Sequence, residues 1–219
     1  MNLPGGESTP PSSTTGSRRL RVKVRYARYR DIGTLSRLYV ALGPESRHGY
    51  HPFPFHRVAV SLIYFSLITA QRLLGWAMRR STRLLAFLFV AEATETGAIV
   101  GSGTLRGVLA PNEPPRVRFG FFVAEGYQGF GVGKSILFGL AEIALGLGYK
   151  QGQGAVFKSD TKAIRAISEV GFRFMDTDFR DPKVPGETNY RTIADLDEMV
   201  RRSRERDRLH GLRTDAAPS

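Results

Sequence analysis

The chain has 219 residues, 42% of them hydrophobic, which is enough for one folded domain with extensions. It contains no cysteine, which excludes disulfides, thiolate metal sites and a cysteine nucleophile, and which suits a reducing cytoplasm. Its 32 Lys and Arg residues outnumber its 20 Asp and Glu residues, and the resulting net charge of +12 attracts polyanionic cofactors, nucleic acids and anionic lipids alike.

Residues 1–17 form the first segment, which is predicted to be a disordered tail. It is rich in Pro, Gly, Ser and Thr and carries almost no apolar side chains that a core could bury. It also lacks the basic start and the apolar stretch of a secretory signal. We therefore expect one folded domain over residues 18–195, followed by a charged, flexible tail over residues 196–219.

The domain is expected to open with a strand and a helix. Residues 21–27 alternate Val with charged side chains, which is typical of a strand. Asp31 is placed to cap a helix that carries Leu35 and Leu38 on its apolar side. The Pro-, His- and Arg-rich stretch 43–55 is then predicted to be a loop.

A long apolar pattern over residues 58–78 predicts a helix and raises the question of a membrane. Its mostly apolar, uncharged run ends after 13 residues, at Ala70, whereas a spanning helix needs about 20. No transmembrane segment is therefore expected. We predict a core helix or the contact face of a homodimer, and Trp76 beside Arg79 and Arg80 keeps a helix lying on a lipid surface as the alternative.

Three strands follow in the chain. Their apolar runs cover residues 84–93, 98–108 and 116–123, and a tight turn over residues 94–97 joins the first two. This pattern predicts antiparallel neighbours.

Residues 119–135 read as the end of a strand, a glycine-rich turn and the start of an apolar helix. Gly129, Gly131 and Gly133 alternate in the turn, and Lys134 follows them. Glycine lets a backbone approach a ligand closely, and the unpaired amides and the dipole of a first helical turn favour an anion. The segment therefore predicts a site for a ligand that carries phosphates.

The spacing of the turn separates the families that use such a device. The dinucleotide fingerprint G-x-G-x-x-G fails because its third glycine falls on Lys134. The P-loop pattern G-x-x-x-x-G-K-[ST] fails only at its first glycine, which is Gln128. The pattern R/Q-x-x-G-x-G/A is matched by Gln128, Gly131 and Gly133, and it resembles the acetyl-CoA-binding motif of the GNAT superfamily of N-acetyltransferases.

The flanking residues strengthen this resemblance. Val123 ends the strand, and the turn Ala-Glu-Gly-Tyr that follows is similar to the family's Pro/Ala-Glu-Tyr-like turn. Further along, the family shows the motif N-x-x-A-I-x-x-x-x-x-x-G-F. Its positions fall here on Asp160, Ala163, Ile164, Gly171 and Phe172. The likeness covers residues 20–194.

The remaining elements complete the expected fold. A strand over residues 154–158, a helix over 161–170 and a hairpin that pairs 172–179 with 190–194 are predicted. With them, the resemblance implies an α/β GNAT fold, whose mixed, mostly antiparallel sheet is flanked by helices and splayed between its fourth and fifth strands. In the tail, residues 201–208 predict a solvated, Arg-rich helix that is open to nucleic acid, another anionic surface or an acidic partner.

The resemblance also implies a site for acetyl-CoA as co-substrate. In the family, acetyl-CoA lies in the gap between the splayed strands, and main-chain amides of the glycine turn hold its diphosphate. The residues implied to bind it are Phe121, Phe122, Val123, Gln128, Gly129, Phe130, Gly131, Val132, Gly133, Lys134, Ser135 and Asp160. An amide near Val123 would polarise the thioester carbonyl.

The usual catalytic side chains of the family are not at their positions in this chain. Ile167 replaces the Tyr that acts as the acid, and Arg118 stands where a Glu is frequent. Ser168, Tyr127 and Tyr190 are the candidate replacements.

The acceptor site is expected in the 43–55 loop, where His48 and His51 would bind an acidic acceptor or relay protons. The loop is similar to S-P-E-S-x-Y-x-R-F-like loops of GNAT proteins that include protein-lysine acetyltransferases, which favours a protein lysine or N-terminus over a small molecule as acceptor. No metal site is expected, because Glu45 is the only carboxylate near these histidines.

These observations predict a cytoplasmic, acetyl-CoA-dependent N-acetyltransferase that acts by direct transfer in a ternary complex. The missing Tyr and Glu leave open a catalytically weak acyl-CoA sensor or a nucleic-acid-associated protein. The near match to the P-loop leaves open a nucleotide phosphohydrolase.

Overall fold

The computed structural model describes residues 20–49, 53–77, 86–108, 115–180 and 188–209. The strands in this part of the chain are β1 (Val22–Tyr26), β2 (Ala86–Ala93), β3 (Ile99–Val108), β4 (Arg116–Val123), β5 (Gln151–Phe157), β6 (Arg173–Arg180) and β7 (Thr188–Asp195). The helices are α1 (Ile32–Val40), α2 (Pro44–Gly49), α3 (Arg57–Ala77), α4 (Val132–Gly146), α5 (Thr161–Glu169) and α6 (Leu196–Leu209), with the short 3-10 turns η1 (Tyr29–Asp31) and η3 (Glu125–Tyr127).

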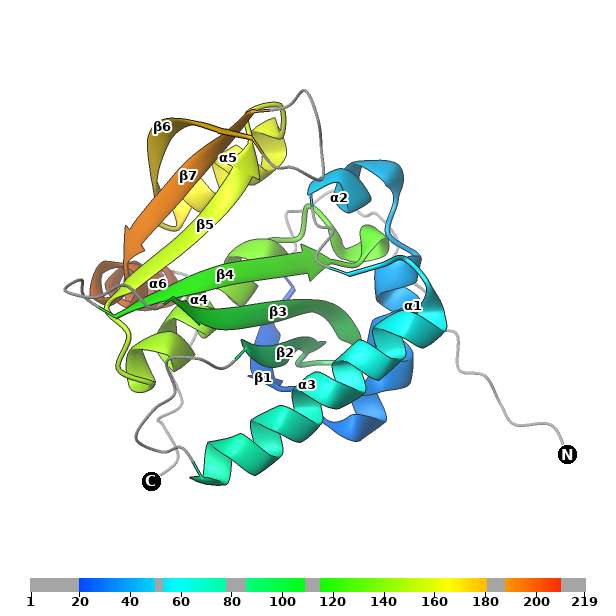
Figure 1. Cartoon of the computed structure of the whole chain (residues 1–219). Coiled ribbons are helices and arrows are strands. Elements are labelled where there is room, and N and C mark those ends of the chain that lie inside the picture. The colour runs from blue at the N-terminus through cyan, green and yellow to red at the C-terminus, as the bar shows by residue number, and fades with distance from the viewer. Residues whose placement is uncertain (1–19, 50–52, 78–85, 109–114, 181–187, 210–219) are drawn as a thin grey trace, which may run out of the picture.

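The strands form one mixed sheet in the order β1-β2-β3-β4-β5-β7-β6 (Figure 1). The neighbouring strands run antiparallel, except for β4 and β5, which run parallel. This arrangement confirms the predicted α/β fold with a mostly antiparallel central sheet. The last strand in the chain, β7, lies between β5 and β6.

Helices cover both faces of the sheet and bury an apolar cluster on each (Figure 1). On one face, α4, α5 and α6 cover the larger cluster, in which Ile136 and Leu140 of α4 are fully buried. On the other face, α1 and α3 bury Leu35 and Ile68 against Leu88 of β2. The helices on this second face contact mainly β2 and β3. They leave β4 and β5 less covered on this face, and the search for a functional site therefore begins at these two strands.

Three segments differ from the expectations drawn from the sequence. Residues Pro44–Gly49, predicted as loop, form the helix α2. The strand β5 begins at Gln151, earlier than predicted, because it pairs with β4 on one side and with β7 on the other. The stretch 201–208, predicted as a solvated helix, belongs to the longer helix α6, whose first turn buries Leu196 and Met199 in the larger cluster.

Asp31 does not cap α1 as predicted. Its carboxylate is only 4% exposed and accepts hydrogen bonds from Arg25 at 2.7 and 3.1 Å and from the Arg28 N–H at 2.7 Å. Arg25 also donates to Glu92 of β2 at 2.7 Å. This single guanidinium therefore joins β1, β2 and the turn that precedes α1.

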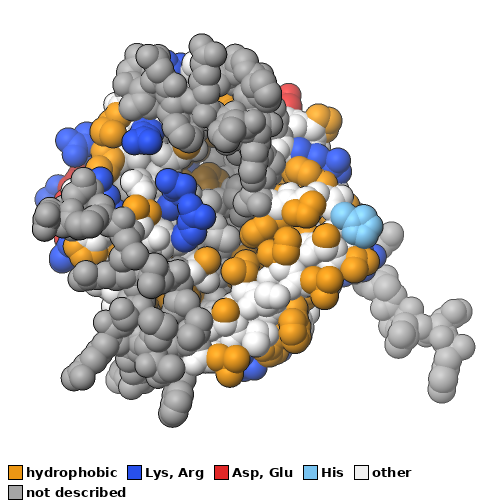
Figure 2. Space-filling model, viewed as in Figure 1, with side chains coloured by type: hydrophobic (Ala, Val, Ile, Leu, Met, Phe, Trp, Pro, Cys, Tyr) orange, Lys and Arg blue, Asp and Glu red, His pale blue; other side chains and the backbone are white. Residues whose placement is uncertain are grey.

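The outer side of α3 is apolar and exposed. Its side chains Val58, Leu62, Phe65 and Leu73 are 52–67% exposed, and they contribute to the band of orange surface in Figure 2. Within the described ranges, none of the helices is both long enough and apolar enough to cross a bilayer.

Candidate active site

The parallel pair β4 and β5 separates after a short ladder. The register joins Arg116 to Gln151, Val117 to Gly152 and Arg118 to Gln153, and it goes no further along the described strands. By contrast, β4 stays paired with β3 over its whole length, as far as Val123. The sheet is therefore splayed on the β5 side of β4, as the sequence predicted.

The splay leaves backbone groups of β4 facing the gap. In an antiparallel ladder, alternate residues direct their N–H and C=O groups to opposite edges of the strand. The Ala124 N–H donates to Val100 of the β3 edge at 2.9 Å, so Phe122 shares that direction, whereas Phe121 and Val123 face β5. The backbone N–H and C=O groups of these two residues can therefore bond to an extended ligand in the way that they would bond to a neighbouring strand.

The segment after β4 presents a helix N-terminus to the same place. Gly129 and Gly131 have φ values of 81° and 77°, in the left-handed region that favours glycine. Gly131 is the N-cap of α4, and the first bond within the helix runs from the Ser135 N–H to its carbonyl at 3.1 Å. The amides that precede Ser135 have no acceptor within the helix, and Gly131 has no side chain to cap them, so they are suited to an anion.

Gly133 has a different role from the other two glycines. A β-carbon there would lie 3.2 Å from the ring of Phe121, so the absence of a side chain lets the first turn of α4 approach β4 closely. At Gly129 and Gly131 an added β-carbon would meet no described atom within 4 Å, and the constraint is the positive φ. The glycine turn thus sets both the shape of the chain and its distance from β4.

Lys134 does not extend freely towards this helix end. Its ammonium group forms an ion pair with Glu169 at the end of α5, and Arg165 donates to the same carboxylate at 3.2 Å. The hydrogen bond from Lys134, opposed by slight desolvation, holds the pKa of Glu169 below its ordinary value. The carboxylate offsets part of the positive charge beside the first turn of α4.

The helix α2 is fastened to the turn that follows β4. Glu125 accepts hydrogen bonds from the Gly43 N–H and the Ser46 hydroxyl, both at 2.8 Å. The Gln128 amide donates to the Ser46 oxygen at 3.0 Å and more weakly to the Val123 carbonyl at 3.4 Å. The segment predicted to bind the acceptor therefore contacts the turn predicted to bind the cofactor, through polar groups that sequence reasoning had not paired.

The candidate catalytic side chains are dispersed. Ile167, at the position of the family's Tyr, is buried in the larger core cluster, and its neighbour Ser168 is exposed on α5. Tyr127 packs against the same cluster from η3. Tyr190 lies between the ring of Phe174, with centroids 5.5 Å apart, and the ammonium group of Lys158 at 4.9 Å.

Asp160 has a structural role in addition to the one implied by the resemblance. Its Oδ1 accepts a hydrogen bond from the Ala163 N–H at 2.9 Å and so caps α5. Of the two predicted acceptor residues, His51 and the side chain of His48 lie outside the described residues.

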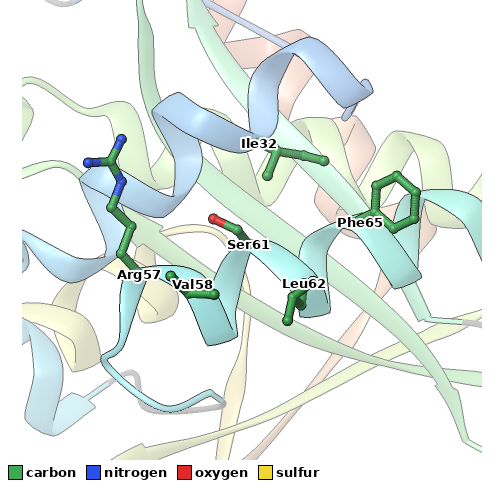
Figure 3. A pocket seen from close by; sticks show the side chains of 6 residues that line it. All are labelled: Ile32, Arg57, Val58, Ser61, Leu62 and Phe65. Carbon is green, nitrogen blue, oxygen red and sulfur yellow. The ribbon is translucent and has the colours of Figure 1, made fainter.

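An open apolar depression lies elsewhere, between α1 and α3 (Figure 3). It is lined by Ile32, Arg57, Val58, Ser61, Leu62 and Phe65. It includes no residue of the glycine turn or of β4, so it is separate from the site built around the splay.

Comparison with known proteins gives this geometry a context. The family model described as the acetyltransferase (GNAT) family matches residues 56–172, more than half of the chain. No curated protein matches the chain at a significant level.

Several solved structures share the fold. One is Mycobacterium smegmatis RimJ in complex with CoA-disulfide, with a TM-score of 0.64 and 18% identity, covering 85% of this chain and 90% of that one. A second is yncA of Salmonella typhimurium with its cofactor acetyl-CoA, with a TM-score of 0.61, 17% identity and coverages of 81% and 95%. A third is the ribosomal-protein-S5-alanine acetyltransferase from Vibrio fischeri, with a TM-score of 0.64, 14% identity and coverages of 80% and 93%.

Proposed function

The chain belongs to the acetyltransferase (GNAT) family, and we propose that it is an acetyl-CoA-dependent N-acetyltransferase that transfers the acetyl group directly to an amine in a ternary complex. The observation that carries the proposal is the early end of the β4–β5 ladder, combined with the N-terminus of α4, which follows β4 through the glycine turn and has no side-chain cap. Two of the similar structures contain CoA-disulfide and acetyl-CoA, which supports the same choice of ligand for this chain.

Different residues around the splay would bind different parts of acetyl-CoA. The amides of Val132, Gly133 and Lys134 would bind the diphosphate, because they point out of the first turn of α4 without acceptors in the helix. The backbone groups of Phe121 and Val123 would hold the pantetheine arm along the free edge of β4. Gln128 orders the turn from its side, since its amide group contacts Ser46.

The chemistry needs a neutral amine and a proton for the leaving thiolate. Acetyl-CoA supplies the activated acyl group, and the N–H of Val123 would stabilise negative charge on the carbonyl oxygen. Ile167, at the position of the family's Tyr, is apolar and buried, and Tyr190 contacts Phe174 and Lys158. We therefore infer that orientation of the reactants and solvent proton transfer provide most of the acceleration.

Two alternative functions, a nucleotide phosphohydrolase and an acyl-CoA sensor, differ from this proposal in the ligand bound or in turnover. A P-loop phosphohydrolase is disfavoured, because the sheet is mostly antiparallel and the family match covers the glycine turn. A catalytically weak acyl-CoA sensor would use the same binding residues without turnover.

The test has two parts. Calorimetry should show binding of acetyl-CoA and none of ATP with magnesium; the reverse result would overturn the proposal. Release of free CoA in the presence of peptide and small amines is then followed with a thiol reagent, which has no background because the chain has no cysteine. Binding without release for any acceptor would favour the sensor.

A further inference from the structure

Two arginines face each other across neighbouring strands next to the splay. Arg106 of β3 is the direct register partner of Arg118 of β4, so both side chains lie on the same face of the sheet. Both are exposed. Like charges directly opposite each other on neighbouring strands repel and lower the stability of the sheet. Because both side chains are exposed, core packing does not explain why two arginines stand here.

The described part of the chain supplies no counter-ion for the pair. Among the described residues, no carboxylate forms an ion pair or a hydrogen bond with either guanidinium group. Partial desolvation, followed by the charges of Arg106 and Arg191, lowers the pKa of Arg118. A bound carboxylate would offset the repulsion between the two charges and compensate for the partial loss of water around Arg118, because guanidinium groups bind carboxylates with paired hydrogen bonds.

The surroundings of the pair mix basic and apolar side chains. The strand registers place Arg106, Arg118, Gln153, Ile193 and Arg173 in one row across the sheet. In the next row, Arg191 lies opposite Met175, which is 44% exposed. Figure 2 shows basic side chains at the centre of this face, beside the apolar surface of α3. Such a mixture suits an acidic peptide better than the uniform phosphate backbone of a nucleic acid.

The position of the pair relative to the transfer point limits the size of the acceptor. Arg118 precedes Val123 by five residues on β4, which corresponds to about 17 Å between their Cα atoms. The arginine side chain shortens this span by part of its own length. Because an extended peptide advances about 3.4 Å per residue, an acidic group about three to five residues from the amine would reach the arginines. The carboxylate of a free amino acid is too close to its amine to do so.

We propose that the acceptor is an acidic peptide segment, whose amine is acetylated beside Val123 while carboxylates three to five residues away are bound by Arg106 and Arg118. This assignment rests on the proposed function. It gives a role to the arginine that stands where the family frequently has a Glu.

The experiment uses the full chain and peptides of one length with a free N-terminal Ala. Positions 4–6, three to five residues from the amine of the N-terminal Ala, carry Glu, Gln or Lys, and a second set has a blocked N-terminus and a single Lys as the amine at the same spacing. We expect kcat/KM for the Glu peptides to exceed that for the Lys peptides by about tenfold at low salt, with the difference shrinking as salt is added. Equal rates, or a preference for Lys, would overturn the inference.

Two variants and a control test the residues. Arg106→Gln and Arg118→Gln should each raise KM for the Glu peptide by about tenfold, with KM for acetyl-CoA unchanged and thermal stability equal or higher, because repulsion is removed. Arg208→Gln removes the same charge from an exposed position of α6 and should leave the Glu-peptide KM unchanged. If it has the same effect as the two variants, net charge explains the preference and the proposed contact is wrong.

A binding measurement separates this inference from the proposed function. Fluorescence anisotropy of the labelled Glu peptide, with CoA present, should show weaker binding to Arg118→Gln than to the wild type even if turnover is absent. Peptide binding that is indifferent to both arginines would overturn the inference while acetyl transfer stands. Displacement of the peptide by a short RNA at lower concentration than by free Glu peptide would also overturn it, in favour of a nucleic-acid ligand.

Discussion

The buried carboxylate of Asp31 shows how a single residue can connect three elements. Replacing it in the variant Asp31→Asn leaves Arg25 with a weaker acceptor and brings an NH2 group close to other donors. We expect the free energy of unfolding to fall by about 3 kcal/mol, as measured by denaturant unfolding at pH 7. The control Glu92→Gln removes the more exposed carboxylate from the same guanidinium and should cost less.

The same pair predicts a dependence on pH. Burial alone would raise the pKa of Asp31, but the hydrogen bonds from Arg25 and Arg28 outweigh it, and the pKa lies below its ordinary value. A carboxyl group with a lowered folded-state pKa contributes stability above its unfolded pKa of about 4 and loses it as the pH falls through the folded pKa. The difference in stability between wild type and Asp31→Asn should therefore shrink below about pH 4. A constant difference down to pH 2 would contradict this explanation.

Two glycines with the same backbone geometry allow a matched test of the phosphate-binding turn. Gly131 has φ 77° and Gly148 has φ 87°, and an added β-carbon meets no described atom within 4 Å at either position. Alanine at either site should lower the free energy of unfolding by about 1–2 kcal/mol, because both positions have a left-handed backbone conformation that is unfavourable for a residue with a β-carbon. Calorimetry should show weaker acetyl-CoA binding, by tenfold or more, for Gly131→Ala alone; equal affinities in the two variants would remove the turn from the proposed site.

At the scale of elements, the attachment of α2 couples the two predicted binding regions. In Glu125→Ala, the Gly43 N–H and the Ser46 hydroxyl lose a shared acceptor, each hydrogen bond being worth about 1 kcal/mol. We expect a higher KM for the peptide acceptor and a smaller change for acetyl-CoA in steady-state kinetics. A double-mutant cycle with Ser46→Ala should be non-additive, whereas additive effects would show that the two residues act separately.

The contact between α4 and α5 predicts a gain of affinity. In Glu169→Gln, the carboxylate beside Lys134 becomes neutral, and the ammonium group is released towards the uncapped amides of α4. We expect acetyl-CoA to bind a few-fold more tightly, with a steeper dependence on salt, because the pair is partly exposed and the Coulomb energy is modest. Isothermal titration at two salt concentrations measures both. Arg165→Gln, which keeps the carboxylate, serves as the control.

The elements that sequence reasoning predicted well are those whose information is local. Glycine and proline punctuation placed β4 at its observed bounds, and the apolar periodicity placed α3 within a residue at each end. The helix α2 was missed because its N-terminus is satisfied by Glu125, which is distant in the sequence. The start of β5 was missed because Gly152 and Gly154 have low strand propensity, and pairing on both sides overrides it.

The site was predictable in its backbone and not in its side chains. The glycine spacing indicated a helix end that binds an anion, and the structure places that end beside the splay. The ion pair of Lys134 with Glu169 and the cross-strand pairing of Arg118 with Arg106 involve residues on different elements, so only the packing and the register reveal them. The role of the loop histidines stays a prediction.

At the scale of the whole molecule, the fold includes α6. Met199 of this helix is fully buried in the larger core cluster, so Met199→Ala should lower the free energy of unfolding by about 2–5 kcal/mol. A chain that ends at Asp195 should expose the larger core and fail to give a cooperative thermal transition. A chain that ends at Leu209 serves as the control and should melt like the full chain. Normal melting of the shorter chain would instead support the domain boundary predicted at residue 195.

The place of β7 in the sheet bears on how the protein is made. The strand β6 lies at the edge and β5 beside the splay, and both find their long antiparallel neighbour in β7, which is synthesised after them. While the ribosome still holds Thr188–Asp195, the nascent chain carries two strands whose pairing groups are satisfied by water or by a chaperone. The pairing of β5 and β6 with β7 is therefore a late step of biogenesis. A pause in translation before β7 would lengthen the time during which the edges of β5 and β6 can aggregate.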